Sequence, residues 1–166
     1  MGLIKTAFFH DDAYHKITSF DYHRTKQRIR IRLEIYPTKD KEKIIATTEF
    51  EINEKTFVKN ARMEAEKTVN NAMIKKIAED KILEIEKELN REPKEGEEKQ
   101  ILTQRAKDKI FMEEKDFAIT EKMKDIGKDL YRGFVEEFEA KNRKTMSLLY
   151  STLKQLIDDY NGAEDA

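Results

Sequence analysis

The residues best suited by type and spacing to bind a ligand form a basic and aromatic group near the start of the chain. Arg28, Arg30 and Arg32 occupy alternate positions, so an extended strand would carry all three guanidinium groups on one face. We expect Tyr14, Phe20 and Tyr22, from the preceding segment, to flank this face. Arginines interleaved with aromatic rings on a sheet suit single-stranded nucleic acid, because arginine pairs with phosphates and rings stack on bases. This surface is the candidate interaction face.

Acidic residues argue against nucleic acid as its ligand. Glu34 lies on the same segment, and Asp21, Glu49 and Glu51 lie on segments expected to pair with it, where they can neutralise the arginines. The whole chain has 33 basic and 34 acidic residues and a net charge of -1. A protein that binds nucleic acid through its phosphates is expected to show a marked basic excess. We therefore favour a solvated or protein-binding face, with a nucleic-acid-binding module as the alternative.

Other groupings offer little chemistry. His10, Asp11, Asp12 and His15 have metal-binding side chains, but their spacing matches no defined ligand pattern, so they predict a solvated turn. The chain has no cysteine, which excludes thiol nucleophiles, thiolate metal sites and disulfides. We expect no enzymatic activity, no cofactor and no metal.

An alternating strand is expected to position the arginines. Residues 27–36 place apolar residues opposite them, a pattern typical of a half-buried strand. Imperfect alternation in the strand that precedes it indicates a bulge or an irregular edge. Residues 1–52 thus predict a small antiparallel meander of three or four strands. The other strands are 14–22, 43–52 and, where there is a fourth, 3–9.

A long helical hairpin is expected next. From Asn53, a suitable N-cap, apolar residues recur every three or four positions through residue 90 without proline or glycine. A proline and a glycine at 91–96 predict a turn, and a second helix is expected from Glu97 to about Lys144. The two helices should return antiparallel and cover each other's apolar stripe.

The last amphipathic segment, residues 146–160, is more apolar and is expected to cover the sheet, with a stop at Asn161–Gly162. The fold class is therefore α+β: a small antiparallel meander packed with a C-terminal helix, plus an inserted helical hairpin. The expected parts are the sheet at 1–52, the hairpin at 53–145 and the completing helix at 146–166.

Both ends of the chain carry a resemblance. The segments are DAYHKI at 12–17, the KDKE loop at 39–42, Leu149–Tyr150, LKQL at 153–156 and YNGAED at 160–165. They resemble the N- and C-terminal segments of small virion structural proteins of tailed bacteriophages. Two features depart from that pattern: Ile157 stands where those proteins tend to have proline, and the hairpin replaces a short link.

The resemblance implies a non-enzymatic structural protein of the tail or connector region, made in the host cytoplasm and located in the virion. Its partners would be other virion structural proteins, and it would form a homo-oligomer or ring in the particle, assembling through the helical hairpin. A chaperone or scaffold that uses the hairpin as a clamp is a further alternative. No membrane association is expected, because no apolar run approaches the roughly 20 residues that span a bilayer.

Overall fold

The computed structural model describes residues 1–40, 43–91, 93–96, 98–140 and 145–166. The chain forms two compact units. The sheet unit comprises Met1–Asn60 and Gly127–Ala166, and the helical unit comprises Ala61–Ile126. Both ends of the chain thus belong to the sheet unit, and the boundaries fall inside the segment expected to be a hairpin. The predicted α+β class is confirmed.

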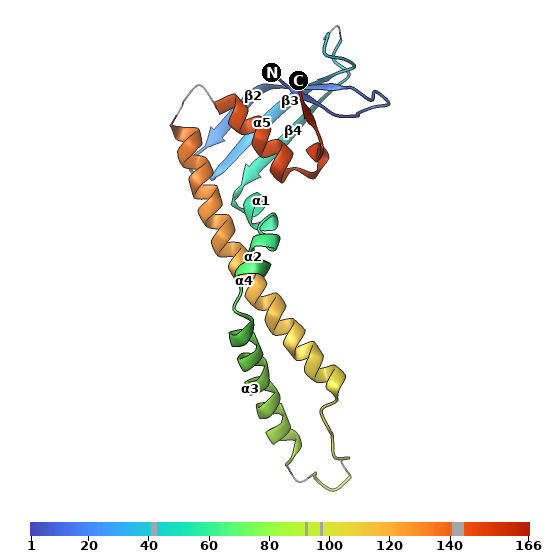
Figure 1. Ribbon diagram of the computed structural model, residues 1–166, viewed down its shortest axis with the longest axis vertical. Coiled ribbons are helices and arrows are strands. Elements are labelled where there is room, and N and C mark those ends of the chain that lie inside the picture. The colour runs from blue at the N-terminus through green and yellow to red at the C-terminus, as the bar shows by residue number, and fades with distance from the viewer. Residues whose placement is uncertain (41–42, 92, 97, 141–144) are drawn as a thin grey trace. The chain divides into compact units, whose positions relative to one another are not determined.

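The sheet is antiparallel, with strand order β4-β3-β2-β1-β5 (Figure 1). The alternating segment forms β3 as predicted, and the expected irregularity in β2 is a register shift between Ile17 and Ser19. A fifth strand, which the sequence pattern did not indicate, adds the last residues to the edge of β1. The strands are β1 (Leu3–Ile4), β2 (Tyr14–His23), β3 (Arg28–Tyr36), β4 (Ala46–Asn53) and β5 (Glu164–Asp165).

Two expected strand boundaries are wrong. The apolar run at 3–9 yields only the two residues of β1, because the backbone reverses at Phe8 and Phe9, ahead of the expected turn. The last strand of the meander begins at Ala46, three residues after the expected start at Lys43.

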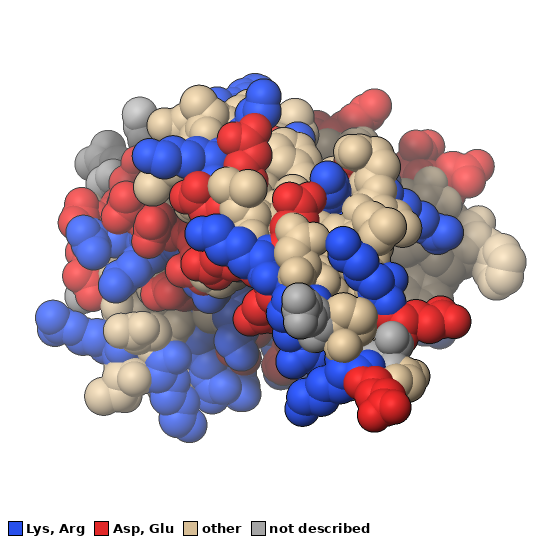
Figure 2. Space-filling model, turned by 90° about the horizontal axis from the view of Figure 1, so that it is seen from below, with Lys and Arg blue, Asp and Glu red and all other residues tan. Residues whose placement is uncertain are grey.

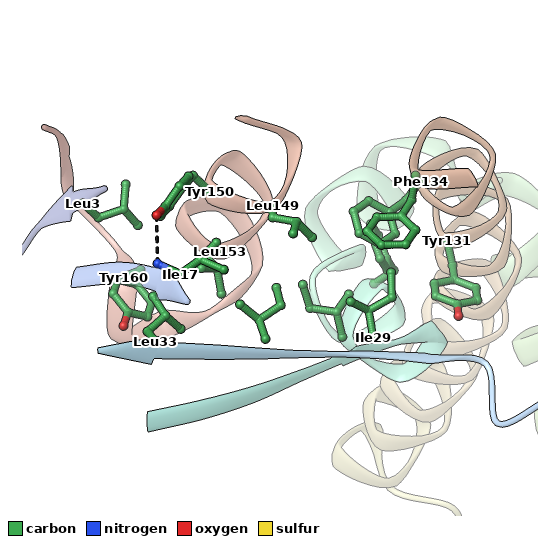
Figure 3. Close-up of a cluster of buried hydrophobic side chains, with 14 residues drawn as sticks. Leu3, Ile17, Ile29, Leu33, Tyr131, Phe134, Leu149, Tyr150, Leu153 and Tyr160 are labelled. Carbon is green, nitrogen blue, oxygen red and sulfur yellow. Dashed lines mark hydrogen bonds between the residues drawn. The ribbon is translucent and has the colours of Figure 1, made fainter. Parts of the chain in front are cut away.

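The core of the sheet unit lies between the sheet and α5 (Thr145–Leu156), and it extends to Phe57, Tyr131 and Phe134 (Figure 3). The apolar face of β3 is buried, and Leu149 and Leu153 of α5 are fully buried in the same cluster. Burying each such side chain contributes about 1.5 to 3 kcal/mol. The prediction that the C-terminal helix covers this face is confirmed. The helix ends earlier than expected, at Leu156, and the short helix η1 (Asp158–Tyr160) follows.

The first helical stretch is not continuous, contrary to expectation. It comprises α1 (Glu54–Lys59), α2 (Arg62–Thr68) and α3 (Asn71–Leu89). Asn53 caps α1 as predicted, with Thr56 completing a capping box. The chain turns extended at Val69, and the side chain of Asn70 then caps α3 by accepting from the backbone N–H of Met73 at 3.2 Å. Competition from such asparagine side chains interrupts the helix without proline or glycine.

The second long helix, α4 (Gln104–Glu139), spans 36 residues. The expected start at Glu97 lies outside the described residues, and residues 98–103 are not helical. The hydroxyl of Thr103 accepts from the backbone N–H of Ala106 at 3.2 Å, which begins the helix later. The expected extension to Lys144 also lies outside the described residues.

Within the helical unit, α3 and the first part of α4 run antiparallel, as predicted. Two ion pairs connect them: Lys81 with Glu114, and Lys107 with Glu86 at 3.0 Å. Later positions in α3 therefore lie beside earlier positions in α4.

Candidate interaction surfaces

The three arginines of β3 share one face, but acidic residues of β4 oppose them. A guanidinium nitrogen of Arg28 donates to Glu51 at 3.4 Å, and the same carboxylate lies 3.9 Å from Arg30. Arg32 faces Glu49 directly across the strands. The neutralisation expected from the sequence is therefore present, and the face alternates in sign.

The aromatic residues divide between the two faces of the sheet. Cross-strand partners project from the same face. Phe20 pairs with Ile31, and Tyr22 lies on the same core side. The bulge between Ile17 and Ser19 is the cause, because one extra residue reverses the alternation of every position after it. The expectation that Tyr22 and Phe20 flank the arginines is wrong.

Tyr14 lies before the bulge and pairs with Tyr36 on the arginine side. Its side chain is only 1% exposed, and its hydroxyl donates to the carbonyl of Met1 at 2.8 Å. A Cβ atom added to Gly2 would lie 2.4 Å from the Tyr14 ring, so the ring packs directly against the backbone there. Tyr14 is therefore a packing residue, with no exposed ring on which a base could stack.

The histidine and aspartate group also divides. Asp11 and Asp12 are exposed, as expected, but His15 is buried and hydrogen-bonded to the carbonyl of Lys5 at 3.1 Å. The prediction that His15 lies in a solvated turn is wrong. Within the described part of the chain, no three His, Cys, Asp or Glu side chains are grouped so as to hold a metal ion.

A mainly apolar groove opens at the end of β2, where the strand meets the C-terminal part of α4. Its volume is about 670 Å³. The ring of Phe138 packs edge-on against Phe20, with centroids 5.6 Å apart, and against Tyr22 at 5.5 Å. We call this the Phe138 groove; its lining residues are Phe20, Tyr22, Arg24, Phe138, Glu139 and Thr145.

A second apolar feature is the turn between β1 and β2. Ala7 and His10 exchange two backbone hydrogen bonds of 3.0 and 2.9 Å, which leaves Phe8 and Phe9 as the central residues. Both have positive φ, 49° and 67°, and their side chains are 60% and 105% exposed. We call this the Phe8–Phe9 turn. Asparagine and glycine are the residues normally found in such a conformation.

A more polar cavity of about 470 Å³ lies beside Tyr131 of α4, still within the sheet unit. The hydroxyl of Tyr131 is buried and has no hydrogen-bond partner among the described residues. Burial raises the pKa of this hydroxyl, so it remains a proton donor at neutral pH. Charged residues of both signs, including Arg24, Glu54 and Lys128, line the cavity.

The helical unit exposes large apolar side chains among balanced charges. Only Ala61, Ala65, Ile74, Ala78 and Ile119 are buried among its described apolar residues. Figure 2 shows acidic and basic side chains intermingled with other residues over the face drawn there. The described large apolar residues of this unit that are more than half exposed are Met63, Met73, Leu83, Ile101, Met112 and Phe117.

Comparison with known proteins gives no matching family model, no matching curated protein and no matching solved structure. Among the residues that the structure describes, no helix combines the length and hydropathy needed to cross a bilayer. Function therefore has to be inferred from the exposed surfaces themselves. The apolar groove and the Phe8–Phe9 turn were not singled out as sites from the sequence, because their exposure depends on the tertiary fold. The helical hairpin was expected to be an assembly surface, but the sequence did not indicate which of its apolar residues are exposed.

Proposed function

We propose that this chain is a non-enzymatic structural protein of a tailed-bacteriophage particle, in the tail or connector region. It joins other virion proteins through α3 and the α4 residues that pack against it. The observation that carries this proposal is the set of exposed large apolar side chains on the helical unit.

Two packed helices bury one stripe each, and the remaining apolar surface is left for a partner. Leu83 of α3 and Met112 and Phe117 of α4 are more than half exposed. The ion pairs around them are mostly exposed, and such pairs contribute about 0 to 1 kcal/mol each. Each of these pairs lies within one helix, so they leave the apolar residues available for contact.

The resemblance to virion proteins supplies the setting. The resembling ends of the chain belong to a single unit, where α5 packs on the sheet and the backbone N–H of Ala166 donates to Gly2 at 3.0 Å. This supports the view that the resemblance to virion proteins concerns one folded unit and not two unrelated segments.

Mass spectrometry of purified particles tests the proposal. We expect the chain in mature particles, in a constant ratio to the other structural proteins. Its absence from mature particles, with presence only in assembly intermediates, would favour the chaperone or scaffold alternative and contradict the proposal.

The contact surface can be tested separately with Leu83→Ser and Phe117→Ser. Both side chains are exposed, so the variants should fold with little change in stability. Incorporation into particles should fall. Leu130→Ser, which removes an exposed leucine from α4 within the sheet unit, is the matched control and should incorporate normally.

A further inference from the structure

The Phe8–Phe9 turn holds two large apolar side chains in water on a backbone that disfavours them. Positive φ brings Cβ close to the neighbouring carbonyl in every L-residue except glycine, and bulky side chains are rare there. Phe9 is fully exposed. Phe8 is partly covered, since it lines a cavity of its own unit beside Phe50 and Tyr160. Neither local backbone preference nor burial in the described part of the chain accounts for Phe9, which points to a contact outside the chain.

The Phe138 groove has the matching character. It is lined largely by aromatic carbon, and its volume of about 670 Å³ leaves room for large side chains. Phe20, in its wall, remains partly exposed beside Phe138. Aromatic rings gain from edge-to-face contacts of the kind that Phe20, Tyr22 and Phe138 already make.

The turn and the groove lie at opposite ends of β2. The turn precedes the start of the strand at Tyr14, and the groove lies at its other end, at Tyr22. At about 3.3 Å per residue the two are separated by roughly 25 Å. A chain therefore cannot place its own turn in its own groove.

The charges beside the two features are complementary. Asp11 and Asp12 follow the turn and are exposed. Arg24 lines the groove, and Lys26 is exposed on the same loop between β2 and β3. Among the residues that the structure describes, none of these four side chains forms an ion pair. The groove's own acid, Glu139, accepts a hydrogen bond from Tyr22 at 2.9 Å.

We propose that the Phe8–Phe9 turn of one copy inserts into the Phe138 groove of a second copy, with Asp11 and Asp12 facing Arg24 and Lys26. The partner in this contact is a second copy of the same chain. As a contribution to particle assembly, the contact rests on the proposed function. The contact is head to tail, since it joins two different surfaces. Repetition of it gives a ring where the rotation closes and a filament where it does not.

Two interface variants test the proposal in purified protein. Phe8→Asn with Phe9→Gly removes both rings and installs the pair that this turn conformation favours. This variant should melt at a higher temperature than the wild type, yet its self-association should weaken on the order of 100-fold, from the loss of two buried phenylalanines. Arg24→Glu alters the groove without touching its packing and should also weaken association. Leu130→Ser is the control and should associate as the wild type does.

Mixing the two variants gives the sharpest result. Each alone has one defective surface, but the turn of the Arg24→Glu chain is intact, and so is the groove of the Phe8→Asn, Phe9→Gly chain. If pairing is head to tail, each variant alone should be monomeric, and mixing the two should give a one-to-one dimer that cannot extend further. Sedimentation velocity measures this change. If the mixture remains monomeric while the wild type associates, the two surfaces do not meet each other.

Because the chain has no cysteine, Phe9→Cys and Phe20→Cys introduce unique thiols. Oxidation of a mixture of the two should give a disulfide-linked heterodimer, whereas a mixture of Phe9→Cys with Leu130→Cys should not. A wild type that is monomeric at all concentrations, or a mixture of Phe9→Cys and Phe20→Cys that gives no disulfide-linked heterodimer, would overturn the proposal. These measurements need no particle, so their failure leaves the proposed function intact, and absence from particles leaves self-association intact.

Discussion

His15 of β2 and Tyr160 of η1 lie 145 residues apart, yet the Nδ1 atom of His15 is 3.0 Å from the hydroxyl oxygen of Tyr160. Their rings meet edge to face, with centroids 5.2 Å apart. The Nε2 atom faces the Lys5 carbonyl, which can only accept, so Nε2 carries the proton and Nδ1 accepts from Tyr160. This buried bond ties the end of the chain to the sheet.

Tyr160→Phe should lower the free energy of unfolding by about 1 to 3 kcal/mol, because it leaves a buried imidazole nitrogen without a donor. Urea denaturation measures the change. Tyr36→Phe is the control: it removes a hydroxyl whose bond to Glu34 is only partly buried, and should have a smaller effect. Equal losses in the two variants would mean that the buried bond has no special weight.

Stability should fall as the pH is lowered from about 7 to 5. Burial lowers the pKa of His15 from its ordinary value of 6.5, and the Lys5 hydrogen bond opposes this only in part. Below pH 6.5 the imidazole of His15 is protonated in the unfolded chain before it is protonated in the folded chain. Acidification therefore favours unfolding. His15→Gln should flatten this slope, whereas His10→Gln should retain it. Denaturation curves at several pH values would count against this account if His15→Gln kept the full slope.

Two glycines of α4 should respond in opposite directions to alanine. A Cβ atom on Gly127 would lie 2.5 Å from the Cα of Val58 in α1, so Gly127→Ala must push these helices apart and should cost about 1 to 3 kcal/mol. Nothing lies within 4 Å at Gly133, where alanine should stabilise the helix by about 0.5 to 1 kcal/mol. Thermal unfolding of both variants checks the sign of each change.

Asn70→Ala should destabilise α3 by about 1 kcal/mol through loss of its cap, with a fall in helical circular dichroism. The adjacent Asn71→Ala serves as the control. Asn71 is exposed in the first turn, and alanine has the higher helix propensity, so that substitution should be neutral or stabilising. A similar loss in both variants would show that the cap at Asn70 is unimportant.

The parts of the fold predicted correctly from the sequence are those set by local pattern. Strict alternation identified β3, the Asn53 cap identified the start of α1, and the apolar face of α5 indicated that it covers the sheet. The helix breaks near Asn60 and Asn70 were missed because they depend on side-chain hydrogen bonds. One of these runs from Asn60 to the carbonyl of Leu156, far away in sequence.

The candidate site was predicted only in part. The arginines and their acidic neighbours lie as expected, but the position of the bulge in β2 could not be derived from composition, and it decides which face Tyr22 occupies. The Phe8–Phe9 turn carries no glycine or asparagine, so turn chemistry gave no signal for it. Its reversal is imposed by the pairing of β1 with β2.

Locating the chain in a cryo-electron microscopy map of the purified particle tests the proposed function most directly. We expect density for the sheet unit in the tail or connector region, with the exposed residues of α3 and α4 buried against another structural protein. A complete map of the mature particle that lacks this chain, or that shows those helix faces in contact with solvent alone, would contradict the account.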